Sequence, residues 1–164
     1  MTTTPETSPA PFLSSVMEIV PEWIDYNGHL NMAFYNVLFD RCGDEAYEIL
    51  GFGPEYAERG FTTYTAEFHL CYVRELHLGD KVRVSLQLLD HDEKRFHTYQ
   101  EIHHVDGWLA ATGEALALHI DRSGPKVAPF PDDIEARLAK MKAEHDALGW
   151  PERAGRKVGI TRKG

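Results

Sequence analysis

The sequence is poor in cysteine, since its 164 residues include only Cys42 and Cys71. Both lie at apolar-patterned positions of a predicted helix and a predicted strand, where buried free thiols are commoner than a disulfide. We therefore expect two free thiols. The nine histidines include no pair with the spacing and partners of a metal motif, and His103 and His104 point to opposite faces of a predicted strand. We expect no bound metal.

Long hydrophobic runs are also missing. The uninterrupted apolar runs span only a few residues, far below the roughly 20 that cross a membrane as a helix. Residues 1–11, rich in Thr, Pro and Ser, have neither the basic start nor the apolar core of a secretory signal, and they predict a flexible tail. The default expectation is a soluble, cytoplasmic protein with no membrane partner.

Positive charge is in deficit, because 17 Lys and Arg face 26 Asp and Glu, giving a net charge of −9. Non-specific nucleic-acid binding depends on basic residues that neutralise phosphates, so this composition argues against it. An anionic ligand would need a local basic cluster. Residues 149–164 carry five Lys or Arg against a single acid, Glu152, and we expect them to form a basic tail.

The spacing of apolar residues predicts one long helix and several strands. From Asn31 to Leu50 apolar residues recur every three or four positions on a wide stripe, which predicts a largely enclosed helix with Asn31 as its N-cap. After Gly60 the pattern alternates with a period of two, and Gly79-Asp80 is a hairpin signal. The predicted strands are residues 12–20, 63–78, 82–88, 94–105 and 108–120, and shorter helices are predicted at 54–60 and 134–148.

These elements predict a single α+β domain over residues 12–148. Short connections between the last four strands favour an antiparallel meander. A five-stranded sheet needs a cover for its apolar face, and the long helix is the available cover, so we expect the sheet to wrap around one central helix.

Along residues 63–78, Tyr64 shares the predicted apolar face with Phe68, whereas Thr65 and Glu67 lie on the opposite face.

The stretch from Trp23 to Tyr35 combines a carboxylate, a glycine and the start of the long helix. Unpaired backbone N–H groups at a helix start can hold an anion or a carbonyl oxygen that is becoming one. With Asn31 expected as the cap, Asp25 has no predicted local partner and is free for chemistry. A carboxylate in such a place acts as a nucleophile or as a general base.

The motif Asp25-x-x-Gly28-His29-x-Asn31, followed by Tyr35, resembles the signature of hotdog-fold acyl-CoA thioesterases of the 4-hydroxybenzoyl-CoA thioesterase type. The stretches Tyr72-x-x-Glu75-Leu76-x-x-Gly79-Asp80 and 109–114 look like further parts of that pattern. Residues 21–29, 92–95 and 118–121 together look like the betainyl-CoA thioesterases associated with carnitine breakdown.

The resemblance implies a hotdog fold and a homodimer, or a dimer of dimers, with active sites where subunits meet. It implies that Asp25 is the catalytic carboxylate and that the backbone N–H near Met32 is the oxyanion donor. Gly28 would supply the backbone angle of the turn, His29 a supporting hydrogen bond, and Asn31 the organisation of the site. No cofactor is implied, because coenzyme A is part of the substrate.

The acyl group and coenzyme A need further contacts. A betaine head group is a quaternary ammonium, which aromatic faces and a carboxylate recognise. The candidate rings are those of Trp23, Tyr26, Tyr64 and Trp108, and Tyr35 is a candidate for lining the acyl pocket. The candidate carboxylate is Glu67, for which a solvated or interfacial polar face of the strand is the alternative. The candidates for the phosphates of coenzyme A are Arg74, Lys94, Arg95 and Arg122. Packing explains each ring equally well, and an ordinary surface position explains each basic residue.

Other functions remain open at this point. Hotdog domains also form hydratases and dehydratases, and the fold alone does not choose among them. The signatures of those enzymes match less well, because only three residues separate Asp25 from His29. A non-catalytic acyl-CoA-binding module is the other alternative. The chain has no Gly-x-Ser-x-Gly elbow, which argues against a serine hydrolase.

Overall fold

The computed structural model describes residues 10–164, so the expected flexible tail falls almost wholly outside the described residues. The helices are α1 (Phe34–Leu50), α2 (Pro54–Glu58) and α3 (Asp132–Asp146), with a 3-10 helix at Pro21–Trp23. The strands are β1 (Phe12–Leu13), β2 (Met17–Glu18), β3 (Phe61–Tyr72), β4 (Lys81–His91), β5 (Arg95–His104), β6 (Leu109–Asp121) and β7 (Lys126–Val127). Between residues 10 and 164, none of the helices is both long and apolar enough to span a membrane.

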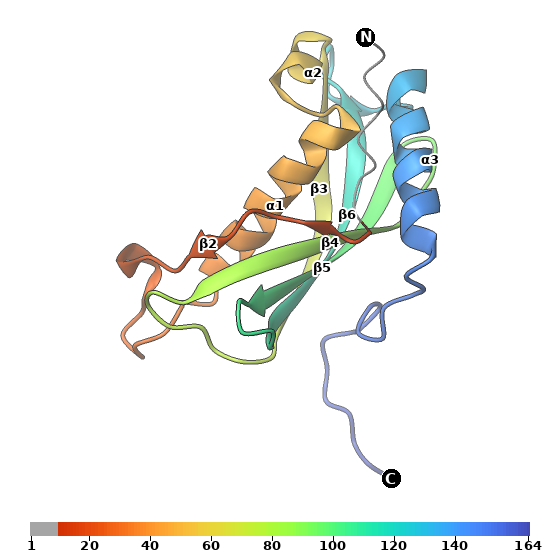
Figure 1. The fold of residues 1–164 in the computed structure, drawn as a ribbon. Helices are drawn as coiled ribbons and strands as arrows, with labels where there is room; N and C mark the ends of the chain where they lie inside the picture. The colour runs from red at the N-terminus through yellow and green to blue at the C-terminus, as the bar shows by residue number, and fades with distance from the viewer. Residues whose placement is uncertain (1–9) are drawn as a thin grey trace.

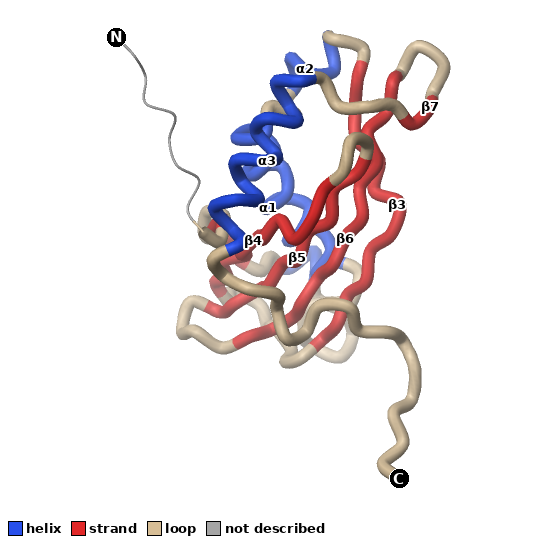
Figure 2. Tube along the Cα trace, turned by 90° about the vertical axis from the view of Figure 1, so that its right-hand side faces the viewer, coloured by secondary structure: helices blue, strands red, loops and turns tan. Residues whose placement is uncertain are grey.

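The sheet is antiparallel with strand order β1-β4-β5-β6-β3, and the short strands β2 and β7 extend it beside β4 and β6. Helix α1 lies across one face of the sheet, and α3 lies on the same side (Figures 1 and 2). Two buried clusters fill the space between these layers, one around the middle of α1 and one beside α3. The predicted α+β arrangement, a sheet wrapped around one long helix, is confirmed.

The predicted hairpin between residues 63–78 and 82–88 is wrong. Strand β3 ends at Tyr72 and pairs with β6, at the opposite edge of the sheet from β4. Residues 73–80 instead cross the end of the sheet, and Leu76 in this crossover is fully buried. The Leu76 carbonyl accepts a hydrogen bond from the Leu30 N–H at 2.7 Å, so the backbone that would have continued the strand is bonded elsewhere.

A β-bulge at Ala66 switches the two faces of β3. Thr65 pairs with Ala117, and Glu67 pairs with the next residue along, Leu116, so Ala66 has no partner. The expectation that Tyr64 shares a face with Phe68 is therefore wrong, because one extra residue reverses the alternation. Tyr64 lies with Glu67 on the outer face, away from α1.

Two predicted boundaries also move. Residues 12–20 form two short strands rather than one, because Ser15 leaves the sheet and donates hydrogen bonds to the Glu45 carboxylate of α1 at 2.8 Å and 2.5 Å. Helix α1 begins at Phe34 instead of Asn31, because a separate turn precedes it.

The cysteines are both free thiols, Cys42 buried and Cys71 half-buried.

The start of the basic segment 149–164 packs on the outer face of the sheet. The Gly155 N–H donates to one Glu114 carboxylate oxygen at 2.7 Å, and the other oxygen lies 2.7 Å from His97 Nε2. The Trp150 ring meets the His97 ring edge-on at a centroid distance of 5.8 Å.

At Gly113 of β6, the Phe39 side chain of α1 lies close against the backbone of the sheet. A Cβ atom there would lie 2.8 Å from Phe68 Cζ and 3.1 Å from two ring atoms of Phe39. Because Phe39 is 1% exposed, its ring has little space into which to move. Glycine is therefore needed at this position for contact distance rather than for an unusual backbone angle.

We predict that Gly113→Ala lowers the free energy of unfolding by about 1–3 kcal/mol, the usual cost of overpacking a core. The matched control is Gly43→Ala in α1, where a Cβ atom meets nothing within 4 Å. Alanine is the better helix former, so this change should raise the free energy of unfolding by up to about 1 kcal/mol. Urea denaturation of both variants checks the pair. Equal stability of the two variants would contradict the close packing at Gly113.

Candidate active site

The residues from Ile24 to Leu30 form a tight turn at the end of the 3-10 helix. Ile24 and Leu30 pair as an isolated antiparallel bridge, and the Asp25 N–H donates to the His29 carbonyl at 3.1 Å. The Gly28 N–H donates to the Asp25 carbonyl at 3.0 Å. Gly28 has a φ of 83°, in the left-handed region that other residues rarely adopt. The turn thus needs glycine at this position, as the sequence predicts.

Asp25 has local partners after all, which corrects the prediction that it has none. One carboxylate oxygen accepts the Asn27 N–H at 2.8 Å, and the other accepts the Asn31 side-chain amide at 3.4 Å. Each oxygen of an ionised carboxylate has two lone pairs, so one acceptor position remains on each. The side chain is half-buried. Its hydrogen bonds fix its direction and leave it able to take a proton or attack a carbon.

Asn31 organises the helix start without being its N-cap. The N-cap residue is Ala33, and the Asn31 side chain accepts the Ala33 N–H at 3.0 Å. The Asn31 carbonyl accepts the Phe34 N–H at 3.0 Å. Between them, the Met32 N–H makes no hydrogen bond within residues 10–164. The structure therefore presents the Met32 N–H as a free backbone donor just before this helix, at the residue that the resemblance indicated.

Tyr72 is a residue of this region that sequence reasoning missed. Its hydroxyl donates to the Met32 carbonyl at 2.9 Å, which joins the end of β3 to the turn before α1. Its ring packs edge-on against Tyr35, at 5.0 Å between centroids. The available signal was its place at the start of the Tyr72-x-x-Glu75-Leu76 motif.

The aromatic candidates do not form one cage. Trp23 is 8% exposed and stacks on Phe34 at 5.9 Å between centroids, whereas Tyr26 is 98% exposed at the tip of the turn. Tyr35 is buried, its hydroxyl accepts the Leu76 N–H at 3.2 Å, and burial raises its pKa, so the hydroxyl stays protonated.

The other candidates lie further apart. Tyr64 and Glu67 are on the outer face of the sheet. Trp108 lies at the end of the sheet that the crossover covers, where its ring stacks on His104 at 4.7 Å between centroids. The structure thus separates the rings and the carboxylate that were expected to bind a head group together. His29 is half-buried, with its ring edge-on to His77 at 6.2 Å.

Among the basic candidates, Arg74 differs from the others. Its guanidinium carbon lies 4.1 Å from the Trp108 ring centroid, and among the described residues Arg74 forms no ion pair. Lys94 lies 3.4 Å from Glu93, Arg95 lies 2.5 Å from Asp92, and Arg122 donates to the Ala57 carbonyl at 3.2 Å.

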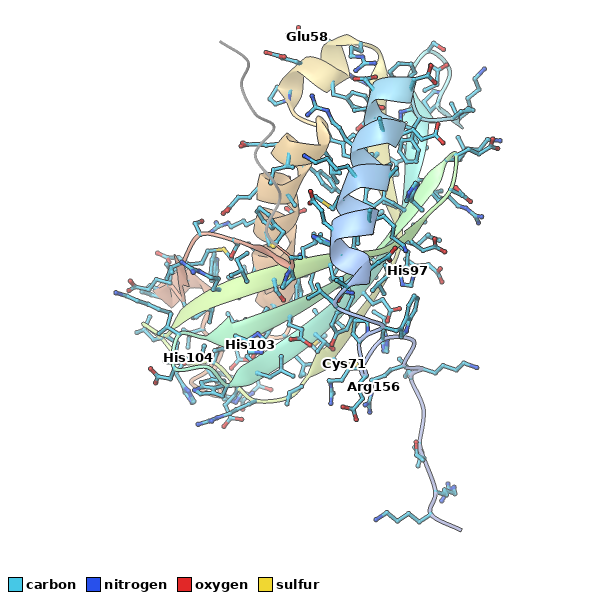
Figure 3. The ribbon with its side chains drawn as sticks, turned by 45° about the vertical axis from the view of Figure 1, so that its right-hand side comes forward. Glu58, Cys71, His97, His103, His104 and Arg156 are labelled. Atoms are coloured by element: carbon cyan, nitrogen blue, oxygen red, sulfur yellow. The ribbon has the colours of Figure 1, made fainter. Side chains whose placement is uncertain are left out.

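The position along the strands also separates Arg74 from the other three. The ten residues of β5 run from Arg95 to His104, which is about 30 Å at the rise of an extended strand. Figure 3 shows His103 and His104 at one end of the sheet and His97 further along. Arg74 lies at the end occupied by His104 and Trp108, whereas Lys94, Arg95 and Arg122 lie at the far end.

A cavity of about 150 Å³ lies between α1 and the sheet, next to β3. The rings of Phe39, Tyr47 and Phe68 line it together with the carboxylates of Asp40 and Asp44. Neither carboxylate forms an ion pair with Lys or Arg in residues 10–164. Burial raises the pKa of Asp44, and the neighbouring charges of Asp40 and Glu48 raise it further. The cavity is thus aromatic and negatively charged.

Comparison with known proteins gives a consistent result. The sequence model of the thioesterase-like superfamily matches residues 19–138. A betainyl-CoA thioesterase of Pseudomonas aeruginosa is 37% identical over 148 residues, covering 87% of this chain and 91% of that protein. An L-carnitine dehydrogenase/betainyl-CoA thioesterase of Rhizobium meliloti is 38% identical over 141 residues, which are 85% of this chain and 28% of that protein.

A similar solved structure is that of a Staphylococcus aureus protein in complex with CoA. It is 30% identical, with a TM-score of 0.86, and the match covers 92% of this chain and 96% of that one. The resemblance drawn from the motif is thereby confirmed. The fold is that of the hotdog thioester hydrolases, and the chain belongs to the thioesterase-like superfamily.

Proposed function

We propose that this protein hydrolyses a short-chain acyl-CoA thioester, with betainyl-CoA as its substrate. The observation that carries the proposal is that the Asn31 side chain bonds both the Asp25 carboxylate and the Ala33 N–H, which directly follows the free Met32 N–H in the chain. A carboxylate and an unpaired backbone donor oriented by one residue suit the hydrolysis of an acyl group.

In the proposed reaction, the Met32 N–H donates to the thioester oxygen as negative charge develops on it. Asp25 acts as a general base, taking a proton from a water whose oxygen attacks the carbonyl carbon, or as a nucleophile whose acyl anhydride water then cleaves. In both routes the C–S bond breaks, one water is consumed, and the thiolate of coenzyme A takes up a proton. The products are the free acid and coenzyme A.

The supporting residues have distinct proposed roles. Gly28 allows the chain to turn back so that Asp25 and Asn31 meet. Asn31 orients the Asp25 carboxylate through its amide and fixes the Met32–Ala33 peptide through its oxygen. His29 supports the turn through its carbonyl, which accepts the Asp25 N–H.

The choice of betainyl-CoA rests on the two named relatives and on the cavity beside β3. Its rings and carboxylates have the chemistry that a quaternary ammonium needs. The cavity begins at Asn36, four residues beyond Met32, which is about 6 Å along a helix. A cation one methylene group away from the thioester carbonyl therefore reaches its near end. We propose this cavity as the head-group site in place of the separated Trp23, Tyr26, Tyr64, Glu67 and Trp108.

For the phosphates of coenzyme A we propose Arg74, because it is preorganised on Trp108 and has no carboxylate partner among the described residues.

We also propose that the protein is a homodimer that pairs through β3. This strand has 12 residues and ends the sheet, so one row of its backbone groups lacks a neighbouring strand in residues 10–164. Both the cavity and Tyr72 border that edge.

The first test is the variant Asp25→Asn, which keeps an oxygen for the Asn27 N–H but cannot take a proton or attack. We predict that kcat for acyl-CoA hydrolysis falls at least a hundredfold, the usual loss when a general base is removed. Release of the coenzyme A thiol is the measurement, and it also distinguishes a hydrolase from a hydratase or a binding module.

The matched control for that variant is Asp121→Asn. Asp121 also accepts a backbone N–H two residues ahead, that of Ser123 at 2.9 Å, but it lies at the far end of β6. This variant should keep full activity. Full activity in Asp25→Asn would refute the assignment of Asp25.

The second test concerns the acyl group. The acyl groups of betainyl-CoA and 3,3-dimethylbutanoyl-CoA have the same shape, and only the betainyl group carries a charge. We predict that Asp40→Asn raises the KM for betainyl-CoA about threefold to fivefold, as expected when one partly exposed charge pair is lost, and leaves the KM for the neutral thioester unchanged. Steady-state kinetics on both substrates measure the difference.

The control for net charge is Glu58→Gln, which removes one negative charge from exposed α2, at the top of Figure 3. Its KM should not change for either substrate. If unsubstituted protein turns over the two thioesters at equal kcat/KM, the choice of betainyl-CoA is wrong, although the thioesterase proposal stands.

A further inference from the structure

We infer that Tyr72 is a positioning residue, which holds the Met32–Ala33 peptide so that the Met32 N–H faces the thioester oxygen. The inference rests on the proposed function and extends it to a residue outside the catalytic turn. Tyr72 is 40 residues away from Met32 in sequence and is the last residue of β3.

The Met32–Ala33 peptide is held at both of its polar atoms. Its carbonyl accepts the Tyr72 hydroxyl at 2.9 Å, and its N–H donates to the Asn31 side chain at 3.0 Å. A peptide group is planar, so two hydrogen bonds on opposite sides fix its orientation. The neighbouring peptide, which carries the Met32 N–H, then has only the two backbone dihedrals of Met32 through which to move.

The other side of Met32 is held as well. The Asn31 N–H donates to the Trp23 carbonyl at 2.9 Å, which ties the chain just before Met32 to the 3-10 helix. The Met32 N–H is thus an unbonded donor between two anchored segments. A preorganised donor of this kind stabilises developing charge without reorganising during the reaction.

Tyr72 is itself held in place. Its backbone pairs with Ala111 of β6, and its ring meets the Tyr35 ring at 90°. Tyr35 is 3% exposed, and its hydroxyl accepts the Leu76 N–H, so the surface against which Tyr72 packs is fixed. Burial raises the pKa of Tyr72, so the phenol remains a protonated donor at neutral pH.

A purely structural role would have different consequences. The Tyr72 side chain is about half exposed, and losing one exposed hydrogen bond changes stability little. A structural hydroxyl would affect the thermal midpoint and leave turnover unchanged. A positioning hydroxyl would affect turnover and the environment of the Met32 N–H.

The test is Tyr72→Phe, which keeps the ring against Tyr35 and removes only the hydroxyl. We expect kcat for acyl-CoA hydrolysis to fall about tenfold, less than the hundredfold or greater loss seen when an oxyanion donor is removed outright. The KM should stay within a factor of about two, because the donor acts as charge develops rather than when substrate binds. In the NMR spectrum, the Met32 amide resonance should shift.

The matched control is Tyr99→Phe. Tyr99 is 4% exposed, and its hydroxyl donates to Glu101 at 2.9 Å on the outer face of the sheet, remote from the turn. This variant loses the same atom and one hydroxyl hydrogen bond, here to a carboxylate away from the turn, so its kcat and its Met32 resonance should match those of the unsubstituted protein.

The outcomes separate this inference from the proposed function. If unsubstituted protein releases no thiol from a panel of acyl-CoA thioesters, the proposed function and the role of Tyr72 both fail. If it does, an unchanged kcat or an unmoved Met32 resonance in Tyr72→Phe overturns the inference alone. A tenfold loss in Tyr99→Phe as well, or a Tyr72→Phe protein that does not fold, would also overturn it, because the effect would then be structural.

Discussion

The arrangement of the site depends on the hydrogen bonds of Asn31. Its N–H donates to the Trp23 carbonyl, and its carbonyl accepts the Phe34 N–H. Its side-chain oxygen accepts the Ala33 N–H, and its side-chain amide donates to the Asp25 carboxylate. These four contacts join the 3-10 helix, the turn and the start of α1. Because one residue orients both the carboxylate and the segment that carries the Met32 N–H, these two groups form a single unit.

That unit is completed by a part of the chain far away in sequence. The crossover at residues 73–80 brings Leu76 against Leu30 and places Tyr72 beside Met32. The crossover exists because β3 pairs with β6 rather than with β4. Strand order therefore has a structural consequence at the site: a β3–β4 hairpin would leave the helix start without its hydrogen-bond partner from the sheet.

Much of the fold was predictable from the sequence, because it depends on short-range patterns. The three-to-four spacing after Asn31 gave the long helix, and alternation gave the main strands. The exchange of strand neighbours was not predictable, since alternation tells which residues share a face and not which strand lies alongside. The bulge at Ala66 is a backbone feature with no signal in composition, and it reversed the positions expected for Tyr64 and Thr65.

The site was predictable in part for the same reason. Asp25, Gly28 and Asn31 lie within seven residues, so their turn is a local property of the chain. The hydrogen bond from Tyr72 to Met32 spans 40 residues and depends on the register of β3 against β6. The separation of the aromatic candidates likewise reflects burial: Trp23 packs on Phe34, whereas Tyr26 is almost fully exposed.

The distribution of charge determines where an acidic protein can bind a substrate that carries several phosphates. The net charge of −9 repels such a molecule at long range, so attraction has to be local. Three of the four basic candidates already have protein partners, two of them carboxylates, whereas Arg74 is held by a neutral ring and keeps its charge available. The uncompensated carboxylates of Asp40 and Asp44 lie instead along α1. Under the proposed function, the two ends of betainyl-CoA, one cationic and one anionic, meet surfaces of opposite sign on α1 and on the crossover. A thioester with a neutral acyl group would gain only one of these attractions, so the same charges that weaken binding of coenzyme A favour an acyl group with a positive charge.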